Sequence, residues 1–172
     1  MPDAELTVRP ATAADADSIG RIQVETWRTA YEGLMPADAL AAASVEARQR
    51  LWREGLSRQL PPERRTFVAE LGGQVVGFAA VGECRDGGAD EGELYAIYLD
   101  HVRWGLGIGR ALLERGEQSL RESGFARARL WVLDGNERAI RFYEAAGWRP
   151  DGRKVDSFQG AEVIELAYSK AL

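Results

Sequence analysis

A glycine-rich turn between an expected strand and an expected helix is the part of this sequence best suited to bind a ligand. Residues 97–113 have the sequence IYLDHVRWGLGIGRALL, with glycines at Gly105, Gly107 and Gly109. Glycines leave little side-chain bulk where the turn meets the helix, so backbone N–H groups there can point at an anion. The helix dipole adds partial positive charge at the same place. The sequence therefore predicts a phosphate-binding turn.

The spacing of these glycines argues against two common nucleotide loops. A P-loop has Lys followed by Ser or Thr after its last glycine, whereas Arg110 and Ala111 follow here. The dinucleotide fingerprint GxGxxG needs a third glycine at position 110 or 112, and those positions hold Arg110 and Leu112. A nucleotide-binding α/β protein is therefore disfavoured, and another phosphate-bearing ligand is expected.

A second signature lies in residues 130–148, LWVLDGNERAIRFYEAAGW. An expected strand is followed by Asn136 and by a helix that carries Phe142 and Tyr143 and ends near Gly147. Asn136 and Tyr143 share one helix face, about 10 Å apart along the axis. In order and spacing, this segment and the glycine turn together resemble the GCN5-related N-acetyltransferase (GNAT) superfamily.

The turn departs from the superfamily pattern at one position. The pattern is Q/R-x-x-G-x-G/A, and the sequence has Trp104 where the pattern has Gln or Arg. Such a turn binds phosphate mainly through backbone N–H groups, so the superfamily's cosubstrate, acetyl-CoA, is still expected. The resemblance implies cosubstrate contacts at Ile97, Tyr98, Leu99, Gly105, Leu106, Gly107, Ile108, Gly109, Arg110, Asn136 and Tyr143.

Acetyl transfer to an amine needs a base for the ammonium proton and a proton donor for the leaving thiolate. The resemblance implies Glu93 as the base and Tyr143 as the acid, because a tyrosine is protonated at neutral pH. The alternatives are a solvated carboxylate for Glu93 and a packed ring for Tyr143. The branch that acetylates ribosomal-protein N-termini has a glutamate where this sequence has Trp131, which weakens the case for that substrate.

Aromatic residues are the candidates for contact with the acceptor amine. Trp27 and Tyr31 lie four residues apart on the first expected helix, and Tyr98 lies on the strand before the turn. Core packing is the alternative for Trp27 and Tyr31. The sequence does not identify the amine, so small molecules and protein amines both stay open.

The elements that must position these residues form an α+β (mixed α/β) domain over residues 1–172. The expected strands are Leu6–Arg9, Thr66–Glu70, Gln74–Val81, Glu93–Leu99, Ala128–Leu133, Trp148–Val155 and Val163–Tyr168. The expected helices run from Thr12 to about Tyr31, over Val45–Leu56, from Gly107 to about Ser123, and over Asn136–Ala146. This order predicts a mixed, largely antiparallel sheet with helices on both faces, which is the GNAT fold that the resemblance implies.

Composition narrows the classes of partner. The net charge of -5 and the lack of a Lys/Arg stripe argue against nucleic acid, and no apolar run is long enough to span a membrane. Cys84 and His101 are the single cysteine and the single histidine, so neither an intrachain disulfide nor a Cys/His metal cluster is expected. The N-terminal residues lack the apolar segment of a secretory signal, so a cytoplasmic location is expected. Homodimers are common in the superfamily and are one expected assembly.

Two functions are compatible with these residues. The first is an acetyl-CoA-dependent N-acetyltransferase that transfers the acetyl group directly, in a ternary complex, to a primary amine of a small molecule or a protein. The second is a catalytically silent acyl-CoA-binding module that senses or regulates. Glu93 and Tyr143 favour the enzyme, since a pure binder needs neither.

Overall fold

A seven-stranded mixed sheet forms the centre of the molecule, with strand order β1-β2-β3-β4-β5-β7-β6. The computed structural model describes residues 5–172, so the first four residues of the expected domain lie outside it. The strands are β1 (Leu6–Pro10), β2 (Arg65–Leu71), β3 (Gln74–Glu83), β4 (Glu91–Leu99), β5 (Arg127–Leu133), β6 (Arg149–Phe158) and β7 (Ala161–Ala171). The helices are α1 (Ala16–Ala30), α2 (Ala37–Ala42), α3 (Val45–Leu56), α4 (Ile108–Glu122) and α5 (Glu137–Ala145), with 3-10 turns η1 (Ala13–Asp15) and η2 (His101–Arg103).

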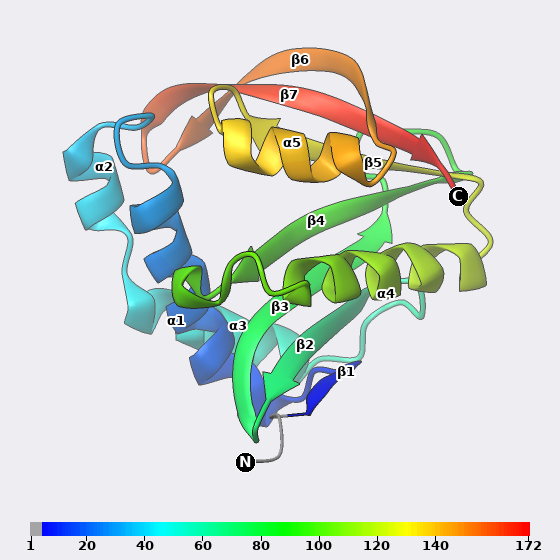
Figure 1. Ribbon diagram of the computed structural model, residues 1–172, viewed down its shortest axis with the longest axis horizontal. Coiled ribbons are helices and arrows are strands. Elements are labelled where there is room, and N and C mark those ends of the chain that lie inside the picture. The colour runs from blue at the N-terminus through cyan, green and yellow to red at the C-terminus, as the bar shows by residue number, and fades with distance from the viewer. Residues whose placement is uncertain (1–4) are drawn as a thin grey trace.

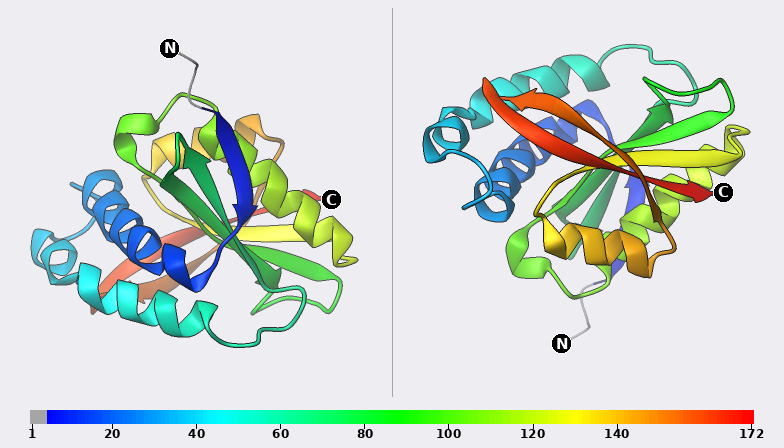
Figure 2. Two further views of the ribbon diagram at one scale, coloured as in Figure 1. Left: turned by 90° about the horizontal axis from the view of Figure 1, so that it is seen from below. Right: turned by 90° about the horizontal axis from the view of Figure 1, so that it is seen from above.

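Helices cover both faces of this sheet, as the sequence predicted. Figure 1 shows α4 and α5 in front of the strands and α1 to α3 behind them, and the views in Figure 2 agree. Among the described strands, β4 and β5 form the one parallel pair, and every other neighbouring pair is antiparallel. The expected α+β fold with a mixed, largely antiparallel sheet is confirmed.

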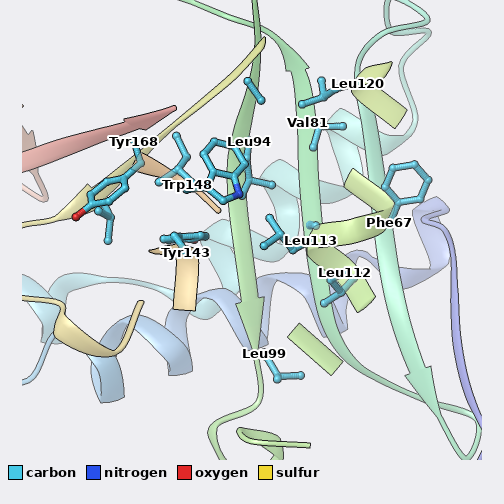
Figure 3. Packing of buried hydrophobic residues seen from close by; sticks show 14 of the residues in the cluster. Phe67, Val81, Leu94, Leu99, Leu112, Leu113, Leu120, Tyr143, Trp148 and Tyr168 are labelled. Carbon is cyan, nitrogen blue, oxygen red and sulfur yellow. The ribbon is translucent and has the colours of Figure 1, made fainter. Parts of the chain in front are cut away.

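The larger core lies between the sheet and the two front helices. This core includes the almost fully buried side chains of Leu112 and Leu113 of α4 and of Trp148 (Figure 3). The ring of Trp148 lies beside that of Tyr143 of α5. Each such aliphatic side chain contributes roughly 1.5–3 kcal/mol by leaving water. Helix α4 approaches β3 closely at Gly116, where an added Cβ would lie 3.1 Å from Val81 Cγ1. This packing fixes the start of α4, and with it the glycine turn, against the sheet.

Strands β4 and β5 pair over only part of their length. Their register runs from Glu91 opposite Arg127 to Leu94 opposite Leu130, while β4 continues to Leu99 and β5 to Leu133. A register shift in the β3–β4 pairing, between Ala80 and Val81, marks a bulge in the same part of β4. Bulges bend a strand and increase its twist, which suits the parting of the two strands. Beyond Leu94, the edge of β4 that faces β5 has no strand partner in the described part of the chain.

Some boundaries differ from the sequence predictions. Strand β4 begins at Glu91, two residues before the expected start, and the short helix α2 was not expected. Pro36 is the N-cap of α2, with a φ of -54° that its ring fixes and a ψ of 135°. Strand β7 lies between β5 and β6, so the β-α-β unit around α5 does not join neighbouring strands.

Two features of residues 5–172 concern membranes and metals. None of the helices is both long and apolar enough to cross a membrane. No group of three or more His, Cys, Asp or Glu side chains is arranged to hold a metal ion in this part of the chain.

Candidate active site

A cavity of about 540 Å³ occupies the gap where β4 and β5 part. Its walls are the second half of β4, the glycine turn, the end of β5 and one face of α5, with Thr26, Ala30 and Tyr31 from α1 and the residue after it. The volume falls within the usual range for small-molecule and cofactor sites. The residues that predicted chemistry in two distant segments of the sequence therefore line one space.

The glycine turn forms one end of this cavity. Gly105 and Gly107 have φ values of 81° and 80°, in the left-handed region that glycine adopts without strain. Gly107 is the N-cap of α4 and supplies no side-chain cap, so the first N–H groups of the helix are free to bind an anion. Leu106 points into solvent and Ile108 packs in the core, so only their backbones can serve a ligand here.

The indole of Trp104 lies beside the turn. Its Nε1 donates a hydrogen bond to the carbonyl oxygen of Leu99 at 3.0 Å. The guanidinium carbon of Arg138, in the first turn of α5, lies 4.3 Å from the centroid of the Trp104 ring. Both side chains line the cavity. Arg138 was not predicted as a site residue, because only the packing of α5 beside the turn brings it to Trp104.

Asn136 and Tyr143 both face the cavity, as their spacing predicted. The Asn136 side-chain oxygen accepts a hydrogen bond from the Ala139 backbone N–H at 3.4 Å and caps α5, which leaves its amide N–H groups for a ligand. Tyr143 is only 8% exposed, and burial, with a smaller effect of Tyr98, raises its pKa well above the ordinary tyrosine value. The Tyr143 hydroxyl has no hydrogen-bond partner among the described residues.

A group of aromatic rings forms the opposite end of the site. The hydroxyl oxygens of Tyr31 and Tyr98 are 3.5 Å apart, and both residues line the cavity. Burial is the main cause that raises the pKa of Tyr31. Trp27 does not line the cavity; its ring meets the rings of Tyr98 and Phe158 edge-on, with centroids 6.3 Å and 4.9 Å away. Trp27 therefore supports the aromatic wall from behind.

Glu93 is bound by Arg85. The side chain of Glu93 is 1% exposed, and its carboxylate accepts hydrogen bonds from the Arg85 backbone N–H at 3.0 Å and from Nε at 3.2 Å. Arg85 also lies over the ring of Tyr95. Glu93 is not among the described residues that line the cavity. The structure therefore brings Glu93 to an arginine instead of leaving it free at the cavity, and its role as a base stays a prediction.

A different carboxylate, Glu165 of β7, acts electrostatically on Tyr31, although it is not among the described residues that line the cavity. Glu165 pairs in register with Leu133 and points to the same face of β7 as Val163, which packs with Leu133 and Trp27. Burial raises its pKa above the ordinary glutamate value, although Lys154 Nζ lies 3.6 Å from its Oε2. The charge of Glu165 also contributes to the raised pKa of Tyr31. No local pattern in the sequence marks Glu165, because strand pairing alone brings it to this face.

The family assignment follows from comparison with known proteins. The model of the acetyltransferase (GNAT) family matches residues 23–148, which include the glycine turn and all of α5. The chain belongs to the acetyltransferase (GNAT) family. The resemblance noted in the sequence is thus confirmed, and the chain is an enzyme of the GNAT class.

Two relatives of this GNAT chain are named acetyltransferases. An uncharacterized N-acetyltransferase, YuaI of Bacillus subtilis, is 37% identical over 160 residues, which cover 92% of this chain and 87% of that one. A mycothiol acetyltransferase of Propionibacterium freudenreichii is 32% identical over 108 residues, which cover 63% of this chain and 33% of that protein. The chain thus spans about a third of the mycothiol enzyme.

Solved structures share the fold along nearly the whole GNAT chain. A GCN5-related N-acetyltransferase from Rhodopseudomonas palustris has a TM-score of 0.78 at 20% identity and covers 100% of this chain and 99% of its own. A PaiA N-acetyltransferase from Thermoplasma acidophilum, solved in complex with coenzyme A, has a TM-score of 0.71 at 20% identity and covers 98% and 99%. A ribosomal-protein-alanine N-acetyltransferase from Brucella melitensis has a TM-score of 0.71 at 27% identity and covers 96% and 99%.

Proposed function

We propose that this GNAT enzyme transfers the acetyl group of acetyl-CoA directly to a primary amine in a ternary complex. The observation that carries the proposal is the single cavity between β4 and β5, which runs from the glycine turn to the unpartnered hydroxyl of Tyr143. A long ligand with phosphates at one end and a thioester farther along fits this arrangement. The coenzyme A complex of the Thermoplasma acidophilum enzyme, which shares the fold, supports the choice of ligand.

The cosubstrate would lie along β4. Its pyrophosphate would accept hydrogen bonds from N–H groups at Gly105, Gly107 and the start of α4. The free edge of β4 beyond Leu94 can pair with the amides of the pantetheine arm in the manner of an added strand. A backbone N–H on that edge can also polarise the thioester carbonyl. The roles predicted for the backbones of Ile97, Tyr98 and Leu99 are part of this proposal.

Tyr143 would act on the leaving sulfur. A thiol such as that of cysteine has a reference pKa of about 8.5. Because burial raises the pKa of Tyr143 far above that, its hydroxyl serves first as a hydrogen-bond donor to the thiolate. Full transfer of its proton would then follow only as solvent or a second group restores the proton to the tyrosine.

The acceptor amine must lose a proton as the new bond forms. The amine nitrogen attacks the thioester carbonyl carbon, the C–S bond breaks, and the electron pair leaves with the sulfur. We assign the amine proton to Glu165, through water, because the charge of this carboxylate acts on Tyr31 of the aromatic wall, although Glu165 does not itself line the cavity. Glu93, bound to Arg85, is the competing base. Substitution of each carboxylate by glutamine distinguishes the two.

A thiol-release assay tests the proposed function. The purified protein and acetyl-CoA would be incubated with small amines and amino acids. Peptides with N-terminal alanine and the acceptor of the mycothiol acetyltransferases would be added, because the names of a structural neighbour and a relative indicate them. Amine-dependent release of free coenzyme A with an acetylated product supports the enzyme. Tight binding of coenzyme A with no release above solvent hydrolysis on any amine supports the silent acyl-CoA-binding module. A cytoplasmic location and a homodimer stay predictions from the sequence.

A further inference from the structure

The charged residues that line the cavity are all cations. They are Arg110, Arg138 and Arg141, in a protein whose net charge is -5. None of the lining residues in the described part of the chain is an aspartate or glutamate. The cavity therefore carries local positive charge, whereas the molecule as a whole is negatively charged. A polyanionic ligand complements this cavity.

Arg138 is held in place by the residue that departs from the family motif. Its guanidinium stacks on the Trp104 ring at 4.3 Å, and the Trp104 indole is fixed by its hydrogen bond to the Leu99 carbonyl at 3.0 Å. A guanidinium stacked on an aromatic face keeps its N–H edges free for a planar, two-point contact with phosphate oxygens. Trp104 thus supplies a platform where the motif has a polar side chain.

Arg138 is also free of competing partners. Among residues 5–172 its guanidinium makes no ion pair or hydrogen bond, and it lies in the first turn of α5, in the wall of the same cavity as Gly105 and Gly107. Arg110 differs, because its Nε donates to Glu114 Oε1 at 2.8 Å and its side chain lies in solvent. Arg138 therefore has its donors available, whereas Arg110 shares its Nε with Glu114.

We propose that Arg138, stacked on Trp104, binds the pyrophosphate of acetyl-CoA together with the glycine turn. The stacked pair would replace the Gln or Arg side chain that the turn lacks at position 104. The pyrophosphate would then have backbone N–H donors from the turn and a charged, two-point donor from Arg138. This proposal rests on the proposed function, because it needs acetyl-CoA in this cavity.

The test compares ligands that lack different phosphates. Calorimetry measures the Kd of acetyl-CoA, acetyl-dephospho-CoA and acetyl-pantetheine for the wild-type protein and for Arg138→Ala, Arg138→Lys and Trp104→Leu. Arg153→Ala, on the exposed part of β6, is the matched control. We expect Arg138→Ala to weaken acetyl-CoA binding about 10- to 100-fold, from the usual strength of a charged hydrogen bond. Arg138→Lys and Trp104→Leu should each lose part of that factor.

The same loss should appear with acetyl-dephospho-CoA, which keeps the pyrophosphate, and should vanish with acetyl-pantetheine, which has none. Equal binding of acetyl-CoA by wild-type and Arg138→Ala would overturn the proposal. A loss that disappears with acetyl-dephospho-CoA would also overturn it, because the arginine would then serve the 3′-phosphate. Failure of the wild-type protein to bind any of the three ligands would instead count against the proposed function.

Discussion

The carboxylate of Glu93 accepts a hydrogen bond from the backbone N–H of Arg85 at 3.0 Å, and the Arg85 guanidinium forms an ion pair with the same carboxylate. This contact ties the start of the loop after β3 to β4. It also occupies the carboxylate that the sequence singles out as a base. A group that must accept a proton from an amine would first have to leave its arginine.

We therefore expect Glu93→Gln to affect stability more than chemistry. The substitution should lower the free energy of unfolding by about 1–3 kcal/mol, because it removes the charge that Arg85 binds. The kcat of the folded variant should stay within about threefold of the wild type, since a bystander supplies none of the 10²-fold or greater effect of a catalytic base. Urea unfolding and steady-state kinetics measure the two effects. A variant of normal stability whose kcat falls about 100-fold or more would restore Glu93 as the base.

Glu165→Gln should remove the acid limb of the pH–rate profile. Burial raises the pKa of Glu165, so its carboxylate is charged, and able to accept a proton, only above a midpoint higher than the ordinary glutamate value. Lys154, Asp156 and Tyr31 are the charged or titratable groups that face it. Activity of the wild type should rise with pH through that midpoint, and the variant should lose about 10²-fold or more in kcat/KM.

Two further variants make the Glu165 experiment specific. Lys154→Met removes the cation that lowers the pKa of Glu165, so the midpoint of the acid limb should move to higher pH. Glu162→Gln, an exposed change on the same strand, should leave the profile as it is. Persistence of the acid limb in Glu165→Gln would show that another group accepts the proton.

Tyr143→Phe should lower kcat by about 10- to 100-fold and leave the KM of acetyl-CoA nearly unchanged. The ring stays in the core, while the hydroxyl that faces the cavity is lost. Tyr168→Phe is the matched control, because its hydroxyl donates to Glu144 Oε1 at 3.1 Å and does not line the cavity. Single-turnover kinetics separate the chemical step from product release. An unchanged single-turnover rate in Tyr143→Phe would remove this residue from the mechanism.

Gly107→Ala should weaken acetyl-CoA binding, while Gly109→Ala should be tolerated. Gly107 has a φ of 80°, and an alanine in that conformation costs about 1–2 kcal/mol, which is roughly 5- to 30-fold if the turn relaxes away from its binding geometry. A Cβ on Gly109 would meet Phe142 at an ordinary 3.6 Å. Calorimetry with coenzyme A checks both variants. Similar affinities for the two would mean that the turn does not bind the pyrophosphate.

The parts of the site that the sequence predicted are those encoded by local spacing. The glycine turn needs only three glycines before a helix, and the shared face of Asn136 and Tyr143 follows from helix periodicity. Both predictions survive in the structure because each depends on neighbours in the chain. The parallel pairing of β4 with β5 was likewise predictable, since a helix connects them.

Contacts between distant segments were not predictable. Arg85 follows β3 in the sequence, eight residues before Glu93, and only the folded sheet places it on that carboxylate. Arg138 and Trp104 meet because α5 packs beside the turn, and Glu165 acts on Tyr31 because β7 lies between β5 and β6. Strand order and helix docking depend on contacts between residues far apart in the chain, so no local sequence pattern predicts them.

A crystal structure of the protein with acetyl-CoA tests the central claim most directly. We predict the pyrophosphate at the N–H groups of Gly105, Gly107 and the start of α4, the pantetheine arm along the free edge of β4, and the sulfur within about 3.5 Å of the Tyr143 hydroxyl oxygen. A cosubstrate bound outside the gap between β4 and β5, or a sulfur far from Tyr143, would contradict the account.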